Sequence, residues 1–393
     1  MTLTIPPNIT PYQLPDEYVQ LRAAARKVCE SEIAPQAATT DRTGQFPVAC
    51  YEALRSCDLH APRVAEEYGG AGADALATAI IVEEVARTCA ASALIPAINS
   101  LGTLILQAAA SPWIKETYLP PIARGETMIS FCLTESEAGS DAAAIAARAE
   151  PIDGGYRING IKRWVTHAGV SSLYIVFAVT DRSAGSRGVS AFLVEKNDPG
   201  LSFGRLEQKM GLKGSPTRDV QLDDVWVPAT RMIGTPGSGF RTALSALAQT
   251  RIVIAAQALG IAQGALEYAT GYVKERKQFG KTLSKFQGVQ FMLAEMAIRV
   301  ESARQLIYAA AGRAQQVDPV DLPLLSSAAK TLASDTAVSV TTDAVQLLGS
   351  YGYSCDYPVE RMMRDAKVTQ IYGGTNQIQR LIIARALLGP DHG

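Results

Sequence analysis

Apolar positions change their spacing twice along the chain, which divides the sequence into three segments. In the first segment they recur at helical intervals: Tyr18, Leu21 and Ala25 fall on one face, and acidic residues precede them in the first turn, where the helix dipole favours negative charge. Residues 74–90 repeat this helical spacing. We therefore expect an N-terminal α-helical domain over residues 1–126.

The second segment consists of short runs that are rich in β-branched and aromatic residues, as is typical of strands. These runs cover residues 128–134, 172–180, 188–196 and 219–228. Asp153-Gly154-Gly155 and Asn159-Gly160 are turn signals that we expect to separate strands. The pattern predicts a β-barrel-like middle domain over residues 127–237.

Helical spacing returns in the third segment and extends over longer stretches. Phe286, Val289, Leu293 and Met296 begin one such series. Two further helices follow, one closing at Gly349 and one covering 377–388. Four long helices with short connections predict an antiparallel four-helix bundle over residues 238–393, so the whole chain is expected to be an α+β protein.

Composition narrows the classes of function. The 393 residues contain 37 Lys plus Arg against 38 Asp plus Glu, and this balance gives no net field that would favour nucleic acid or an anionic membrane. The apolar stretch 91–110 is interrupted by Pro96, Asn99 and Gln107, so we read it as a buried helix rather than a membrane span.

Targeting and metal signals are weak. The first 20 residues lack the basic and apolar regions of a secretory signal, which predicts a cytoplasmic location. The six cysteines form no CxxC pair and no histidine lies at metal-ligand spacing, so we expect no metal site. The three histidines share no local constellation with a nucleophile, which disfavours a hydrolase.

Candidate chemistry is concentrated in five motifs, and no Walker loop or GxGxxG is among them. Singly, they have ordinary structural readings: Thr134 and Ser140 could cap turns, Trp164 could fill a core, and Arg276 could end a helix. In order along the chain, the motifs are FCLTESEAGSD (131–141), KRWVTHAG (162–169), ERKQFGKTLSKFQ (275–287), QLLGSYGY (346–353) and GGTNQIQR (373–380).

Together, these motifs resemble those of the acyl-CoA dehydrogenase family, most closely its short- and branched-chain members, and the resemblance covers essentially the whole chain. Such flavoproteins use FAD to introduce a double bond next to a coenzyme A thioester. The resemblance implies an acyl-CoA substrate, an electron-transferring flavoprotein as electron acceptor, and a homotetramer built as a dimer of dimers.

The resemblance also implies roles for residues of the middle segment. Leu133 and Thr134 would give hydrogen bonds to the polar edge of the flavin, Trp164 would pack on its ring, and Thr166 would meet its N5 position. An aromatic wall and a fixed hydroxyl suit hydride transfer because they exclude water and orient the ring. Phe131 and Ser140 complete this implied set, with Ser140 also near coenzyme A.

A second implied set reaches the pyrophosphate and adenine of FAD bound by a neighbouring subunit, so each cofactor site would need two chains. A guanidinium fork suits a pyrophosphate in charge and geometry. This set contains Arg276, Gln278, Phe279, Phe286, Gln287, Gln346, Leu347, Gly349 and Ser350; Thr375 and Gln377 are further implied cofactor contacts.

Ser215, Arg251 and Gly374, with Ser140, match substrate-side positions of the family. Ser215 is also explained as a turn residue before Pro216, and both readings stay open.

The motif at residues 372–375 departs from the family pattern. Most members have Tyr-Glu-Gly-Thr there, and the glutamate is the base whose backbone N–H also holds the thioester oxygen, as in an oxyanion hole. In this chain the position is Gly373, which keeps the N–H and lacks the carboxylate. A minority of members place the glutamate just before the arginine matched by Arg251, where this chain has Thr250.

Loss of a positioned base removes roughly 10²–10⁴ in rate, or about 3–5 kcal/mol of barrier. Glu135, Glu137, Glu360 and Asp365 resemble acids that family members carry beside their base, and we assign none of them to the role.

Three hypotheses remain. The chain is a dehydrogenase whose base was removed, by nature or by an experimenter; a different acyl-CoA enzyme on the same fold, such as a desulfinase; or a catalytically silent subunit of a hetero-oligomer. A desulfinase should hold its sulfinate with a cation, and residues 89–102, which would line the acyl pocket, contain no arginine. The sequence does not predict acyl chain length.

Overall fold

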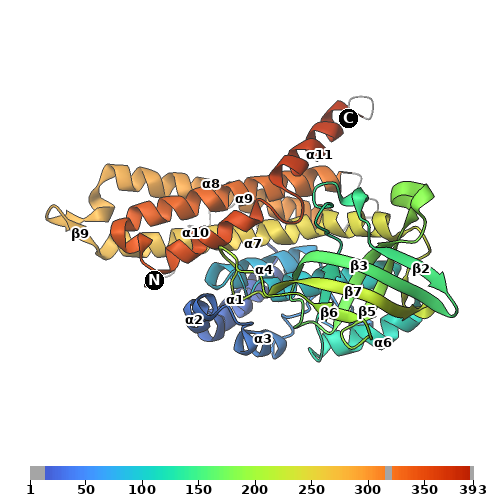
Figure 1. Ribbon diagram of the computed structural model, residues 1–393. Coiled ribbons are helices and arrows are strands. Elements are labelled where there is room, and N and C mark those ends of the chain that lie inside the picture. The colour runs from blue at the N-terminus through green and yellow to red at the C-terminus, as the bar shows by residue number, and fades with distance from the viewer. Residues whose placement is uncertain (1–13, 315–320, 390–393) are drawn as a thin grey trace.

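The computed structural model describes residues 14–314 and 321–389. The first 13 residues, on which the expectation about targeting partly rests, lie outside this range. Figure 1 shows three parts: helices of the N-terminal segment, a sheet domain at one end, and long C-terminal helices that run across the molecule. This arrangement confirms the predicted order of helical, sheet and helical domains.

The N-terminal part is built of helices, and two of them, α4 and α6, begin at side-chain caps. Asp74 accepts a hydrogen bond from the N–H of Ala77 at 2.7 Å, and Ser111 accepts one from the N–H of Ile114 at 3.3 Å. The apolar stretch 91–110 forms a buried helix, as predicted. The helices are α1 (Asp16–Val28), α2 (Ala37–Thr43), α3 (Val48–Arg55), α4 (Ala75–Thr88), α5 (Leu94–Ala109) and α6 (Pro112–Ala123).

The middle part is one sheet with the strand order β6-β7-β3-β2-β4-β5-β8, and β1 pairs in parallel with β4. Burial alternates along β7, whereas β4 and β5 are buried on both faces. The strands are β1 (Ile129–Cys132), β2 (Arg148–Ile152), β3 (Gly155–Thr166), β4 (Leu173–Val179), β5 (Val189–Glu195), β6 (Leu201–Phe203), β7 (Thr217–Pro228) and β8 (Met232–Ile233).

One predicted turn is wrong. Asn159 and Gly160 lie inside β3, where the register with β7 shifts between Ile158 and Gly160, while the other predicted turn does separate β2 from β3. A Cβ on Gly160 would lie 2.6 Å from the Cβ of Ala147, so this glycine permits a close approach at a bulge.

The C-terminal part is a bundle in which α10 packs against α7 and α9. The helix at 377–388, which was predicted as one of the four long helices, is not the fourth member of this bundle; α10 is. Helix α11 contacts α9 and projects away from the bundle (Figure 1). The elements are α7 (Gly239–Glu275), β9 (Lys277–Gln278), β10 (Lys281–Thr282), α8 (Gln287–Arg313), α9 (Leu322–Leu348), α10 (Pro358–Thr369) and α11 (Asn376–Leu388).

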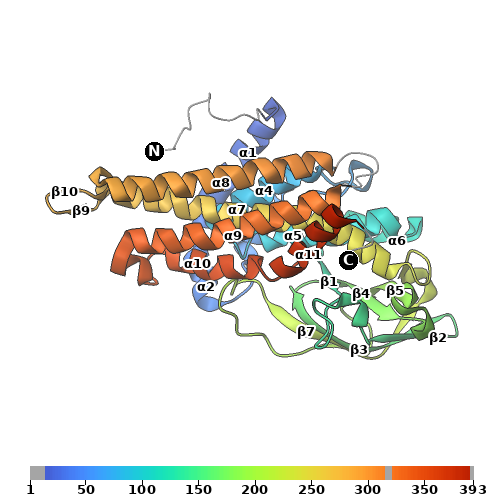
Figure 2. The ribbon, with the colours of Figure 1, turned by 90° about the horizontal axis from the view of Figure 1, so that it is seen from above.

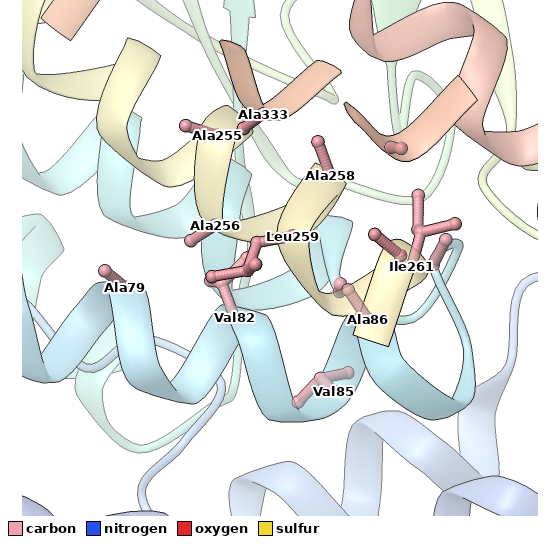
Figure 3. Close-up of a cluster of buried hydrophobic side chains, with 14 of the residues drawn as sticks. Ala79, Val82, Val85, Ala86, Ala255, Ala256, Ala258, Leu259, Ile261 and Ala333 are labelled. Carbon is pink, nitrogen blue, oxygen red and sulfur yellow. The ribbon is translucent and has the colours of Figure 1, made fainter. Parts of the chain in front are cut away.

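Small side chains let the central helices approach closely. Figure 3 shows Ala79 and Val82 of α4 beside Ala256 and Leu259 of α7. A Cβ on Gly260 would lie 2.2 Å from the carbonyl oxygen of Glu83, so this crossing tolerates no side chain there. By length and composition alone α7 could cross a membrane, but most of its apolar stretch is buried against other helices, which accounts for its hydrophobicity.

Candidate active site

The predicted flavin contacts of the middle domain lie together on β1, β3 and the loop after β1. The carbonyl of Thr134 accepts a hydrogen bond from the N–H of Arg163 at 2.8 Å, and the carbonyl of Leu133 accepts one from Lys162 Nζ at 3.2 Å. Ser130 Oγ donates to the carbonyl of Thr166 at 2.7 Å. These bonds fix the backbone of one predicted contact segment against the other.

Trp164 is not a core residue. Its φ is +58° and 56 % of its surface is exposed, so the ring is held outward from β3. The hydroxyls of Thr134 and Thr166 and the N–H groups of Leu133 and Thr134 form no hydrogen bond to any other described residue. An exposed aromatic face beside unused donors fits a flat ring with a polar edge, as in a flavin. Phe131 packs on Phe177 at 5.1 Å between ring centroids, and Ser140 is exposed.

The second predicted set gathers at the far end of the bundle. The guanidinium carbon of Arg276 lies 5.2 Å from the ring centroid of Tyr351, which follows Ser350. Phe279 at the tip of the β9–β10 hairpin is 91 % exposed, and its ring lies 6.1 Å from that of Phe286. Within this set Leu347 is buried, Phe286 is half-buried, and Gln278, Gln287, Gln346, Gly349 and Ser350 are exposed.

The two sets do not meet within one chain. Figures 1 and 2 show the hairpin and the sheet domain at opposite ends of the bundle. Ile254, which contacts the turn at residues 373–375, is separated from the end of α7 at Glu275 by roughly 30 Å along the helix, at about 1.5 Å per residue. The structure therefore places Arg276 and Phe279 away from Trp164.

The turn before α11 has an unusual backbone. Gly373 and Gly374 have φ of +63° and +87°, and buried side chains hold their carbonyls: Gln379 Nε2 donates to both, at 3.2 and 3.0 Å, and Lys330 Nζ donates to that of Gly374 at 2.9 Å. The N–H groups of Gly373, Gly374 and Thr375 have no partner among the described residues. The turn thus presents free donors, which suit an oxyanion.

Thr375 is also the N-cap of α11, because its hydroxyl accepts a hydrogen bond from the N–H of Ile378 at 3.3 Å. Gln377, in the first turn of that helix, is exposed.

Neither usual position supplies a base. The Cδ1 of Ile254 occupies the space beside Gly373, only 2.2 Å from the place that a Cβ would take. The hydroxyl of Thr250 donates within α7 to the carbonyl of Ala246 at 2.8 Å. Tyr372 donates its hydroxyl to Gln257 Oε1, and burial raises the pKa of Tyr372 far above the range of a base at neutral pH.

The four acids that resemble residues beside the family's base do not act as a base here. Three of them make structural ion pairs or hydrogen bonds, and the fourth is exposed. Glu135 pairs with Lys162 at 2.6 Å, and Glu360 pairs with Arg364 at 2.7 Å. Asp365 accepts a hydrogen bond from the N–H of Leu212 at 2.6 Å, and burial raises its pKa to about 6. Glu137 is exposed at a shallow depression of the sheet domain.

The substrate-side residues Ser215 and Arg251 are buried, and each has a polar side-chain atom that makes no hydrogen bond to another described residue. Ser215 is in a turn, since its N–H donates to the carbonyl of Leu212 at 3.0 Å, yet its buried hydroxyl has no hydrogen-bond partner among the described residues. Both readings of Ser215 therefore stand. Arg251 is buried, and its Nε has no hydrogen-bond partner in the part of the chain that the structure describes.

Sequence reasoning missed a cavity of about 710 Å³ at the beginning of α7. Arg187 and Arg241 bring positive charge to it, while Phe240, Leu244 and Gln249 add apolar and amide surface. This volume suits a large ligand with an anionic part. No sequence motif marks the residues that line this cavity, because the helical spacing at the start of α7 is also typical of a helix that only packs against its neighbours.

Comparisons with known proteins agree with this architecture. Profiles of the acyl-CoA dehydrogenase N-terminal, middle and C-terminal domains match residues 15–126, 130–225 and 237–388. The chain is 51 % identical to a protein named probable acyl-CoA dehydrogenase FadE25 of Mycobacterium tuberculosis strain H37Rv, over 97 % of this chain and 98 % of that protein.

Two solved structures are similar over the whole fold. Butyryl-CoA dehydrogenase from Megasphaera elsdenii superposes with a TM-score of 0.92 at 40 % identity, covering 96 % of this chain and 100 % of that one. A chain from a structure titled as the electron transferring flavoprotein of Acidaminococcus fermentans gives a TM-score of 0.93 at 39 % identity, with the same coverage.

The sheet domain between two helical domains, with a donor-lined turn before the last helix, defines an acyl-CoA dehydrogenase type of fold and site. The chain belongs to the acyl-CoA dehydrogenase family of oxidoreductases.

Proposed function

We propose that this protein binds FAD and an acyl-CoA thioester, and that Gly373 makes it a poor α,β-dehydrogenase. The turn at residues 373–375 carries the proposal: its N–H groups are free to hold a thioester oxygen, while the base position has no carboxylate and is covered by Ile254. In the family, this position supplies both a base and a backbone N–H for the thioester oxygen. Gly373 retains the N–H and lacks the base.

FAD supplies the hydride acceptor when it is bound. The residues that would hold its ring are Trp164, by packing, and Leu133, Thr134 and Thr166, by their unused donors. The exposed ring of Trp164 and the unused donors on the neighbouring strand segments support this assignment.

A homo-oligomer follows from the separation of the two predicted cofactor sets. Because Arg276 and Phe279 lie at the far end of the bundle from Trp164, a second copy would have to bring them to the cofactor. The exposed apolar side chains of Leu381, Leu387 and Leu388 on the projecting α11 suit burial in such an assembly. A dimer of dimers and an electron-transferring flavoprotein as acceptor are the family-based parts of this proposal.

The test is an anaerobic visible spectrum of the purified protein during titration with butyryl-CoA. We expect a bound flavin whose absorption band shifts as the thioester binds, with little bleaching. Absence of flavin would contradict the cofactor assignment, and rapid bleaching would contradict the impaired dehydrogenation.

One observation favours the desulfinase-like alternative. Such a reaction needs a cation for the sulfinate, and residues 89–102 supply none. Arg251 on α7 is a buried guanidinium with no carboxylate partner among the described residues, so a cation that could hold a sulfinate lies outside residues 89–102.

A further inference from the structure

Two lysines are buried among the described residues, and they differ in their partners. Lys162 Nζ lies 2.6 Å from the carboxylate of Glu135, as expected of a buried charge. Lys330 has no exposed surface either, yet its Nζ contacts neutral oxygens, the carbonyl of Gly374 and Oδ1 of Asn376, each at 2.9 Å. Within the described part of the chain, the charge of Lys330 is therefore not used to pair a carboxylate.

The surroundings of Lys330 bring further positive charge. Burial lowers the pKa of Lys330 to about 7; the carboxylate of Asp335 on the same helix opposes this shift, while Arg251 of α7 and Arg380 of α11 add to it. Asp335 is itself engaged, because Arg380 lies 2.7 Å from it and its Oδ1 accepts a hydrogen bond from Asn376 Nδ2 at 2.8 Å. Among the described residues, this junction of α7, α9 and α11 thus has more positive than negative charge.

Lys330 and Gln379 determine where the N–H groups of the glycine turn point. In a trans peptide, the carbonyl of one residue and the N–H of the next point in opposite directions. Lys330 Nζ holds the carbonyl of Gly374, so the N–H of Thr375 points away from α9. Gln379 Nε2 holds the carbonyls of Gly373 and Gly374, so the N–H of Gly374 also points away from its amide. These N–H groups have no partner among the described residues and are left for a ligand.

The turn depends on such contacts because it consists of two glycines with positive φ, which resist other backbone conformations only weakly. A neutral donor is enough for this purpose, as the amide of Gln379 shows. A buried ammonium group is costly, so its charge calls for a further explanation. A positive charge behind the peptide between Gly374 and Thr375 polarises it and attracts negative charge to its N–H side.

We infer that Lys330 is a positioning residue of the thioester site: it aims N–H groups of the turn at the thioester oxygen, and its charge stabilises negative charge that develops on that oxygen. This inference rests on the proposed acyl-CoA function. It assigns part of the oxyanion stabilisation to a side chain that lies behind the turn and does not itself contact the substrate.

Acetoacetyl-CoA is a suitable probe, because this 3-oxo thioester ionises to an enolate that shares its negative charge with the thioester oxygen. The enolate absorbs in the near ultraviolet, so a pH titration of its difference spectrum on the FAD-loaded protein gives the pKa of the bound ligand without turnover. We expect this pKa to lie at least about one unit below that of free acetoacetyl-CoA, which means about tenfold tighter binding of the enolate than of the neutral form. Calorimetry with butyryl-CoA measures binding of a thioester that stays uncharged.

Substitutions of Lys330 separate its charge from its hydrogen bonds. Lys330→Met removes both, and Lys330→Gln keeps a neutral donor. Both should raise the pKa of bound acetoacetyl-CoA by about one unit and weaken butyryl-CoA binding by about threefold or less. Lys330→Arg should retain most of the wild-type effect. Lys27→Met removes an exposed lysine of α1 and should match the wild type.

The unmodified protein provides a test that does not depend on the folding of a variant. Lys330 is charged below its pKa of about 7 and loses its charge above it, while the arginines that face it keep theirs. The ratio of the affinities for butyryl-CoA and coenzyme A should therefore fall as the pH rises from about 6 to about 8. Both ligands carry the same phosphates, so phosphate ionisation cancels. Lys330→Gln should give a constant ratio, which separates Lys330 from Asp365, whose pKa of about 6 lies in the same range.

The inference fails if bound acetoacetyl-CoA has the same pKa in Lys330→Gln as in the wild type, since Lys330 would then only hold the turn against α9. An affinity ratio of the unmodified protein that stays constant with pH also contradicts it, and loss of FAD from the variants would place Lys330 at the cofactor instead. If neither thioester binds to the FAD-loaded protein, the proposed function fails as well; binding that does not depend on Lys330 overturns this inference alone.

Discussion

The Cδ1 atom of Ile254 lies 2.2 Å from the position that a Cβ on Gly373 would occupy. Real Cβ contacts are much longer, and φ of +63° at residue 373 adds a backbone cost of about 1–2 kcal/mol for any residue with a Cβ. Position 373 is thus shaped for glycine in two respects. A glutamate at position 373 therefore requires the side chain of Ile254 to move.

We predict that Gly373→Glu alone restores little dehydrogenation and that Gly373→Glu with Ile254→Val restores more, because valine lacks the obstructing methyl. The measurement is the anaerobic rate of flavin bleaching by butyryl-CoA, and we expect about a tenfold advantage for the double variant within the range of a positioned base. Ile254→Val by itself should bleach no faster than wild type. A single variant as fast as the double variant would show that Ile254 offers no hindrance.

Removing the unpaired charge of Arg251 should stabilise the ligand-free protein. Arg251→Gln relieves the burial of an uncompensated cation and its repulsion of Lys330, so we expect a higher melting temperature. Arg304→Gln is the matched control, because it removes the closer of the two cations that pair with buried Glu83 and should destabilise the protein by about 3–5 kcal/mol. A fall in melting temperature for Arg251→Gln comparable to that of Arg304→Gln would mean that Arg251 has a stabilising partner after all.

The sequence predicted the architecture because periodicity and local motifs carry it. Strands rich in β-branched residues and helices with a regular apolar face are local properties, and the motifs around Trp164 and Gly373 are short and distinctive. The absence of the carboxylate is also evident from the sequence, because Gly373 stands where most family members have glutamate. Errors arose where one local signal has two structural meanings: Asn159-Gly160 is a bulge inside β3, and the apolar helix at 377–388 projects from the bundle.

Relationships between distant residues were beyond the sequence. The sequence alone does not place the methyl of Ile254 against Gly373, or Lys330 Nζ against the carbonyl of Gly374, because these pairs are separated by about 120 and 40 positions and meet through helix packing. The cavity with Arg187 and Arg241 is likewise assembled from separate elements. Whether a buried charge is paired is also a property of the fold alone.

His167 should make the protein sensitive to acid. Burial, with a contribution from Lys209, lowers its pKa to about 3, and neither ring nitrogen has a hydrogen-bond partner in residues 14–314 and 321–389. A depressed pKa means that its stabilising contribution is complete above the ordinary value of about 6.5 and is lost as pH falls towards 3, at about 1.36 kcal/mol per pKa unit.

The measurement for this prediction is the melting temperature between pH 7 and pH 4. His167→Leu keeps an apolar group against Phe46 and cannot take up a proton, so its melting temperature should fall less steeply with acid than that of wild type. Parallel profiles would show that protonation of His167 does not limit stability in acid.

Asp365 joins the sheet domain to the bundle, because its buried carboxylate accepts the N–H of Leu212 in the loop before β7. Its pKa is raised to about 6 by burial, against the ordinary value of about 4. A raised pKa has the opposite consequence from that of His167: the stabilising contribution is present in acid and is lost as pH rises through about 6.

Two substitutions separate the charge of Asp365 from its hydrogen bond. Asp365→Asn keeps an acceptor and cannot ionise, so it should raise the melting temperature at pH 8 and match wild type near pH 4. Asp365→Leu leaves the N–H of Leu212 unpaired and should destabilise by about 1–3 kcal/mol at both pH values. If Asp365→Asn were less stable than wild type at pH 8, the negative charge itself would be needed, and the nearby Arg361 and Arg364 would outweigh the cost of burial.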